Sequence, residues 1–187
     1  MLPLLLVHGI CHSGQCWEAN YVPFFTVRSH DVYTLSLRGH GNDRSRLDQY
    51  GLDDYVDDVI SALSQLDGKA VLMGHSMGGA LAQKAMSRAS ERVAAVVLLA
   101  SMVPGSMTAL EKLLSLRKPG SVLAFKQLLA GTPLSPAQIN RLPFFNGRLN
   151  ESQVRNASQW LQPKSKKALG ELGSFTTPGG PKRSRCW

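Results

Sequence analysis

The chain has 187 residues, of which 43% are hydrophobic, and it carries a formal net charge of +8. This length and apolar share predict one globular domain with a sizeable core. The longest unbroken apolar runs, at residues 4–7 and 93–100, are far shorter than the roughly 20 residues of a membrane-spanning helix, so neither a transmembrane segment nor a membrane partner is expected.

The first predicted element is a strand at residues 4–7, a short apolar run that His8 and Gly9 close. Residues 1–7 have no basic flank and no small-residue cleavage site, so we interpret them as a strand and not as a secretory signal. A cytoplasmic location is therefore expected.

The loop after this strand contains two of the three cysteines, Cys11 and Cys16, and the third is Cys186. Their number is odd and their spacing is not that of metal ligands, so we expect reduced thiols, no metal site and no cofactor. A Cys11 nucleophile is a weaker hypothesis, because nothing in the sequence places a base beside it.

Strand and helix patterns alternate along the rest of the first hundred residues. The helix at 53–66 has apolar residues at helical spacing and two aspartates in its first turn. The alternation predicts an α/β fold, with a mostly parallel sheet, right-handed crossovers and helices on both faces. The predicted strands are 31–37, 70–73 and 93–100, the helices are 17–25, 53–66 and 80–90, and residues 74–79 form a glycine-rich turn.

The pattern changes after Pro104, where only short helices separated by proline, glycine or asparagine are predicted and no strand pattern returns. The tail at 173–187 has no periodicity and is expected to be disordered. The last 47 residues hold 9 basic and 2 acidic side chains, yet no aromatic residues interleave with the basic cluster, so no specific nucleic-acid partner is expected. The predicted helices are 108–116, 121–129, 136–142, 151–161 and 164–172.

The strongest chemical signal is the run G-H-S-M-G at residues 74–78, which directly follows an apolar strand and precedes a helix. A sharp strand-to-helix turn strains the backbone of its central residue, and flanking glycines remove side chains that would collide there. Ser76 is therefore the predicted nucleophile, exposed above the sheet over the positive end of a helix. The alternative is a tight glycine turn with an idle serine.

A second motif, L-L-V-H-G-I at residues 5–10, is a strand that ends at His-Gly. With both motifs the chain resembles the α/β-hydrolase family of serine hydrolases and esterases. The resemblance implies that backbone N–H groups of Ile10 and Met77 form an oxyanion hole, which stabilises charge on a carbonyl oxygen. His8 would orient this loop or be a satisfied structural histidine.

The resemblance extends over residues 1 to about 172 and includes the turn L-R-G-H-G at 37–41. It implies a hydrolase core at 1–103, the nucleophile half of the fold, and a helical cap at 104–172, followed by the basic tail at 173–187. Residues 142–148 and Trp160 are candidates for an acyl or aromatic pocket, a plain cap core being the alternative.

One part of the family pattern is not found. In the family the chain leaves the cap for two more strands, which carry the triad acid and then the histidine, but here all five histidines lie at or before His75. Glu151 and Glu171 remain downstream, both in predicted helices. We therefore expect a partial fold without its final core strands. Neither the triad acid nor the base can be identified. A substitute base would have to come from His12, which is expected to be an exposed loop histidine, or from a partner chain.

The ending is interpreted as a frameshift, an alternative ending or a truncation, which the residues do not separate. Without final strands, the strand at 93–100 would leave an edge open to self-association.

Two functional hypotheses follow. The first is a serine hydrolase that acts on ester or related acyl groups of a small-molecule substrate and is impaired because its triad is incomplete. A serine nucleophile fits esters, thioesters or activated carbon–carbon bonds, whereas epoxide and haloalkane hydrolases of this fold use a carboxylate nucleophile. The second is a catalytically inactive hydrolase-fold binding protein or a nonfunctional truncated product. Nucleic-acid binding by the basic tail ranks below both.

Overall fold

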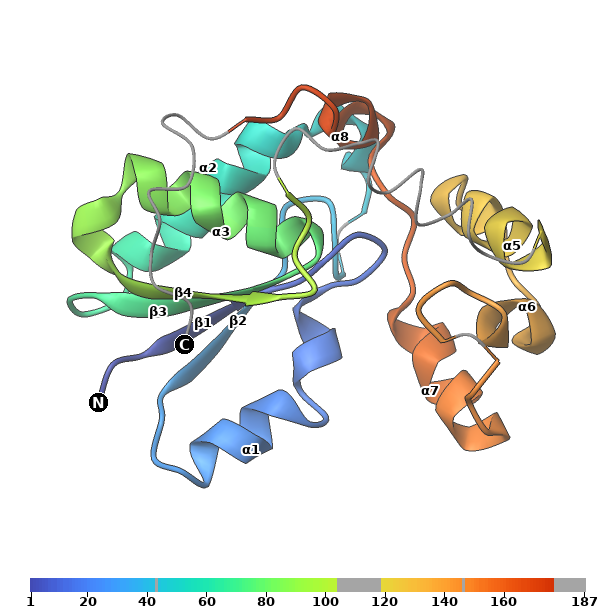
Figure 1. Ribbon diagram of the computed structural model, residues 1–187, viewed down its shortest axis with the longest axis horizontal. Coiled ribbons are helices and arrows are strands. Elements are labelled where there is room, and N and C mark those ends of the chain that lie inside the picture. The colour runs from blue at the N-terminus through green and yellow to red at the C-terminus, as the bar shows by residue number, and fades with distance from the viewer. Residues whose placement is uncertain (43, 104–118, 146, 177–187) are drawn as a thin grey trace.

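The protein is an α/β structure built on a four-stranded parallel sheet (Figure 1). The computed structural model describes residues 1–42, 44–103, 119–145 and 147–176. The strands are β1 (Leu4–Val7), β2 (Val32–Leu35), β3 (Ala70–His75) and β4 (Val93–Leu99), in the order β2-β1-β3-β4. All three pairings are parallel, which confirms the predicted fold class.

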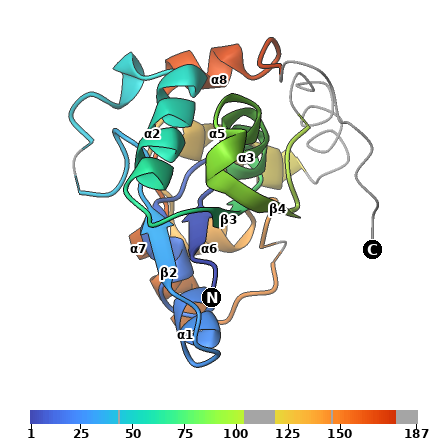
Figure 2. The ribbon, with the colours of Figure 1, turned by 90° about the vertical axis from the view of Figure 1, so that its left-hand side faces the viewer.

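Helices cover both faces of this sheet. Helices α2 (Leu52–Ser64) and α3 (Met77–Arg88) lie on one face, and α1 (Tyr21–Thr26) lies on the other (Figure 2). The larger hydrophobic core lies under α2 and α3 and continues into the helices after residue 119, while a smaller core surrounds Trp17 on the α1 side. The three-layer arrangement leaves the carboxyl ends of the strands free to carry a site.

Several predicted boundaries differ from the structure, two of them near the site. The helix expected at 17–25 is a 3₁₀ turn at Gly14–Trp17 followed by α1, because Pro23 lacks an N–H and is accommodated in the first turn of a helix. The glycine-rich turn expected at 74–79 is much shorter, since β3 continues through His75 and α3 begins at Met77. Further 3₁₀ turns are Leu47–Gln49 and Ser90–Arg92.

The second half of the chain is helical. Helices α5 (Pro119–Leu129), α6 (Pro136–Asn140) and α7 (Glu151–Trp160) form a lobe beside the sheet, here called the cap lobe (Figure 1). The predicted helix at 108–116 lies outside the described residues. None of the helices that the structure describes is long and apolar enough to cross a membrane.

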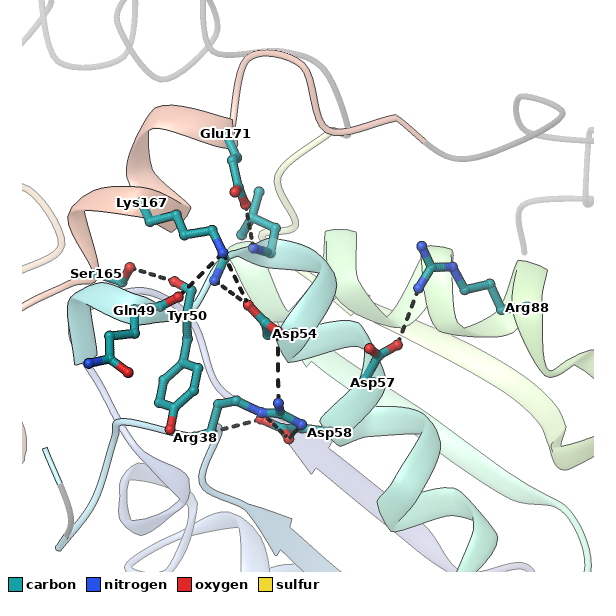
Figure 3. Close-up of polar contacts among 12 residues, drawn as sticks. Arg38, Gln49, Tyr50, Asp54, Asp57, Asp58, Arg88, Ser165, Lys167 and Glu171 are labelled. Carbon is teal, nitrogen blue, oxygen red and sulfur yellow. Dashed lines mark hydrogen bonds and ion pairs between the residues drawn. The ribbon is translucent and has the colours of Figure 1, made fainter. Parts of the chain in front are cut away.

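Helix α8 (Lys166–Glu171) returns from the cap lobe to the start of α2. Several polar contacts hold it there (Figure 3). Glu171 Oε2 accepts a hydrogen bond of 2.6 Å from the N–H of Leu52, and the Ser165 hydroxyl donates one of 2.6 Å to the carbonyl of Tyr50. The helix predicted at 164–172 thus begins two residues later, because Ser165 is its N-cap and accepts from the N–H of Ala168.

One edge of the sheet is open within the described residues. There β4 pairs only with β3, and no described strand lies on its other side. Val97 and Leu98 on this strand are 36% and 46% exposed. Apolar side chains of β4 are therefore partly exposed, while self-association through this edge stays a prediction.

Candidate active site

Ser76 is the single residue that turns the chain from β3 into α3. Its φ of 52° and ψ of −118° lie outside the usual regions for a residue with a side chain. Three backbone hydrogen bonds hold this conformation: the Ser76 N–H donates to Leu99 (3.0 Å), and the Ser76 carbonyl accepts from Gly79 (3.1 Å) and Met102 (2.9 Å). Ser76 as a whole is partly buried, and the exposure of its hydroxyl stays a prediction. Such maintained strain is typical of functional positions.

The two glycines of the motif permit this turn. A Cβ atom at Gly74 would collide with the backbone of Gly78, and a Cβ atom at Gly78 would collide with the carbonyl oxygens of Val7 and His8. The spacing of glycines around Ser76 therefore lets the start of α3 pack directly on the ends of β3 and β1.

The loop after β1 lies against the same turn. A Cβ atom at Gly9 would stand 3.0 Å from the Cβ of Ser76. The next residue, Ile10, is buried, and Met77 provides the first N–H of α3, which has no partner within the helix. The fold thus brings both residues that were predicted to donate to an oxyanion beside the turn; the role itself stays a prediction.

His8 is a structural residue of this loop. Its side chain is fully buried, its Nδ1 lies 2.8 Å from the carbonyl oxygen of Gly9, and its Nε2 accepts a hydrogen bond from the N–H of Leu37 (3.2 Å). These partners require a neutral ring with the proton on Nδ1. Burial and the nearby His40 lower the pKa of His8 well below its ordinary value. His8 therefore links the loops after β1 and β2 and has no free nitrogen for Ser76.

His12 is not the exposed loop histidine that the sequence predicts. It is partly buried, its Nδ1 lies 2.9 Å from the carbonyl oxygen of Ile10, and its ring meets the edge of Phe144 at 5.8 Å. Burial lowers the pKa of His12. The expectation was wrong because Phe144, more than 130 positions away in the sequence, covers this loop.

The cysteine hypothesis is not supported by the geometry. Cys11 is buried, and burial raises the pKa of its thiol to about 12. The same cause raises the pKa of Cys16 to about 12. Thiols with such pKa values are protonated at neutral pH and are poor nucleophiles. No group of three or more His, Cys, Asp or Glu within the described part of the chain is arranged to hold a metal ion.

A cavity of about 480 Å³ lies between the loop after β1 and helix α7. Phe145 and Trp160, which were candidates for an acyl or aromatic pocket, both contribute to its wall, whereas Leu142 is in the core. Its lining includes amide side chains but no Asp, Glu, Lys or Arg. The full set is His12, Cys16, Ala19, Asn20, Phe145, Leu149, Gln153, Asn156, Ala157 and Trp160.

Sequence reasoning missed Lys164. This side chain is only 2% exposed, and its Nζ lies 2.9 Å from the sulfur of Met77 and 4.4 Å from the ring centroid of Tyr55. Burial lowers the pKa of Lys164 to about 7. No sequence signal distinguishes it from Lys166 and Lys167 nearby, because lysine is ordinarily exposed.

Comparison with known proteins identifies the family of the chain. Residues 4–183 match the family described as "Alpha/beta hydrolase family". The chain belongs to this family. The sheet order and the helical layers fit this assignment, and the strand-to-helix turn at Ser76 lies within the matched residues.

Curated relatives of this alpha/beta hydrolase include esterases. Salicylic acid-binding protein 2 of Nicotiana tabacum is 33% identical over 106 residues, or 55% of this chain and 40% of the relative. Methylesterase 7 of Arabidopsis thaliana is 36% identical over 104 residues, or 54% of this chain and 40% of the relative. The chain therefore spans about 40% of the length of these relatives.

A solved structure extends the likeness beyond the aligned sequence. The crystal structure of a methylesterase from Arabidopsis superposes with a TM-score of 0.69 and covers 96% of this chain and 73% of that chain. Its identity is 21%, so this likeness concerns the fold, including the lobe after residue 119.

Proposed function

We propose that this chain is a serine hydrolase for ester or related acyl bonds of small molecules, with Ser76 as the nucleophile. The observation that carries the proposal is the positive φ of Ser76 at a strand-to-helix turn, with the loop of Gly9 and Ile10 packed beside it. The names of the relatives, among them methylesterases, support ester chemistry.

In this mechanism the Ser76 oxygen attacks the carbonyl carbon, and its proton passes to a base. The N–H groups of Ile10 and Met77 would hold the negative oxygen that forms. Collapse of this intermediate releases the alcohol, and water then hydrolyses the acyl-serine. The fixed backbone around Ser76 suits this role, because donors that are placed before reaction need no reorganisation during it.

The identity of the base limits the expected rate. Among the described residues, the recorded hydrogen-bond partners of His8 and His12 are backbone groups of Gly9, Leu37 and Ile10, and not Ser76. An oxyanion hole and substrate binding alone leave roughly 10³ to 10⁴ over water in a triad enzyme. We therefore propose slow turnover by this chain, with any faster rate depending on a base from His12 or from another chain.

The cavity beside His12 supports an uncharged group on the substrate. Its wall combines the rings of Phe145 and Trp160 with amides such as Gln153 and contains no formal charge unless His12 is protonated. Transferring a carboxylate there would remove its water without supplying a cation. Neutral aromatic or aliphatic groups fit this lining best.

The same observations favour a second candidate function. A formed cavity beside His12, together with described histidines His8 and His12 whose hydrogen-bond partners do not include Ser76, suits a catalytically inactive protein that binds a small neutral molecule. The two candidates differ only in whether Ser76 reacts.

Turnover of p-nitrophenyl butyrate by the folded chain, compared with Ser76→Ala, separates them. We expect measurable hydrolysis that the Ser76→Ala variant loses, and a slower rate with the charged hemisuccinate ester. A His12→Ala variant tests the substitute base. Equal rates for the wild-type chain and Ser76→Ala would sink the hydrolase proposal and leave the binding protein.

A further inference from the structure

An interior lysine, Lys164, contacts the side chain of Met77, one of the two proposed oxyanion donors. Lys164 belongs to the segment that returns from the cap lobe to α8, and two hydrogen bonds of 2.9 Å hold this segment across the carboxyl ends of the strands. The N–H of Gln162 donates to the carbonyl of Cys11, and the N–H of Gly41 donates to Oε1 of Gln162. These contacts of Gln162 hold the segment that carries Lys164 against the loops after β1 and β2.

Among the described residues, the amine pairs with no carboxylate. Its Nζ instead contacts the thioether of Met77 at 2.9 Å and lies 4.4 Å from the ring centroid of Tyr55. A thioether is a weak acceptor, and a tyrosine ring attracts a cation through its face. Both contacts tolerate a charged amine without neutralising it.

The titratable groups around Lys164 come from several elements. His8 and His40 follow β1 and β2. Burial is the largest cause that lowers the pKa of both, and the charge of Lys164 lowers both further. Cys11 and Glu171 act on the amine in the opposite direction, while burial is the largest effect and lowers its pKa to about 7. At neutral pH the amine is therefore protonated for part of the time.

The position of the amine relates it to charge at the site. Met77, which it touches, directly follows Ser76, and Cys11, which interacts with it electrostatically, directly follows Ile10. Lys164 thus contacts one expected oxyanion donor, Met77, and interacts with Cys11, the residue that follows the other donor, Ile10. Charges in a water-poor interior interact more strongly than in water, so an ammonium here would act on an oxyanion held by those donors.

We propose that Lys164 is a positioning residue of the Ser76 site, whose ammonium form lies behind the pocket of Ile10 and Met77 and stabilises negative charge there. This inference rests on the proposed function. The alternative is a lysine that only fills interior space, as a methionine would.

The test is the rate at which a fluorophosphonate probe labels Ser76 in the wild-type chain and in Lys164→Met, from about pH 5.5 to about pH 9. We expect the wild-type chain to react faster by on the order of tenfold at the acidic end. This ratio should fall toward one as the pH rises through about 7, because wild-type Lys164 then loses its proton. Taking the ratio removes the dependence on pH that both chains share.

Two further variants complete the design. Lys164→Arg keeps the charge at every pH, so it should remain faster than Lys164→Met at the alkaline end, and this comparison decides the matter if the methionine variant does not fold. Lys166→Met is the matched control, since the Lys166 side chain is 79% exposed, and its rate should equal that of the wild-type chain. Circular dichroism at each pH confirms that the chains are folded.

The outcomes separate the inference from the proposed function. A ratio that stays constant across the pH range, with Lys164→Arg no faster than Lys164→Met, would show a purely structural lysine and overturn the inference, while Ser76 labelling would leave the hydrolase proposal standing. If folded wild-type chain does not label at Ser76 at any pH, both fail.

Discussion

At the scale of single residues, the site depends on a backbone conformation that its neighbours enforce. Ser76 keeps a positive φ because its N–H donates to Leu99 and its carbonyl accepts from Gly79 and Met102, which fixes the peptide groups before and after it. Residues in such regions cost of order 1 to 3 kcal/mol and persist only when the surroundings over-determine them. The close contact of α3 with the ends of β1 and β3 provides this constraint on Ser76.

Gly78→Ala tests this contact. The new Cβ would collide with the backbone carbonyls of Val7 and His8, which cannot move as a side chain would. We expect urea unfolding to show a loss of roughly 3 kcal/mol in the free energy of unfolding. The control is Gly170→Ala in α8, where nothing lies within 4 Å of the new atom, and a gain of up to about 1 kcal/mol is expected there. Equal effects at both positions would refute the packing argument.

Lys164 gives stability a dependence on pH. Its pKa falls from 10.5 in an unfolded chain to about 7 in the folded one, so between these values the unfolded state binds more protons and stability rises with pH. From about pH 7 to about pH 8 we expect a gain of roughly 1 kcal/mol, before Cys11 and Cys16, whose pKa values are raised in the folded chain, titrate substantially in the unfolded chain near pH 8.5.

Urea unfolding of the wild-type chain and Lys164→Met across this window measures the effect. The methionine variant should be more stable at pH 7 and should lack the rise. A wild-type curve that is flat over the window would mean that Lys164 keeps its ordinary pKa in the folded protein.

Local sequence predicted some of these residues and not others. The motif around Ser76 is contiguous, so strand, turn and helix could be read together. The burial of His12 and Lys164 depends on Phe144 and on Met77 and Tyr55, which are 87 or more positions away, and no local pattern records such contacts.

At the scale of elements, helix α8 is held by its ends. The carboxylate of Glu171 caps the first N–H of α2 at Leu52, across 119 positions, and lies at the positive end of that helix (Figure 3). This contact fixes the end of the segment that carries Lys164 over the strands.

Replacing Glu171 with alanine should loosen this docking. We expect a loss of about 1 to 2 kcal/mol in the free energy of unfolding, since a buried helix start loses its cap. Hydrogen exchange in residues 161–176 should speed up. Glu151→Ala is the matched control, because the Glu151 side chain is 96% exposed and its ion pair among the described residues is with Arg155 at 3.8 Å. A change of at most about 0.5 kcal/mol is expected there. Unchanged exchange in Glu171→Ala would show that other contacts hold α8.

Periodicity predicted most elements because amphipathic helices and apolar strands repeat locally. It predicted their ends less well. Helix α1, with Pro23 in its first turn, and helix α8, capped by Ser165, begin later than predicted, and β3 ends later than its apolar residues indicate. Capping and sheet pairing set these ends, and both depend on geometry that hydrophobic spacing does not encode.

At the scale of the whole molecule, β4 is an edge strand of the described sheet and exposes the apolar side chains of Val97 and Leu98. No charged residue occurs from Val93 to Leu99, and charges are a common means of protecting an edge strand. We propose that a second copy of the chain pairs with this edge. Two identical strands related by a two-fold axis run antiparallel and leave no mismatch of charge.

Sedimentation velocity tests this proposal over a range of concentrations. We expect the wild-type chain to associate, and Leu98→Lys to stay monomeric, because a lysine would place charge in the pairing. Leu123→Lys is the control, since Leu123 is a 59% exposed residue of α5 away from the edge, and it should associate like the wild-type chain. If Leu98→Lys associates as strongly as the control, the β4 edge is not the interface.

The central claim is that Ser76 is the reactive residue, and intact-mass and peptide analysis after fluorophosphonate treatment tests it most directly. We predict one adduct per folded chain, located at Ser76 and lost in Ser76→Ala. The adduct should remain in Ser101→Ala, because the hydroxyl of Ser101 in the wild-type chain donates to the carbonyl of Met102. An adduct that persists in Ser76→Ala, or a folded wild-type chain that gains no adduct, would contradict the account.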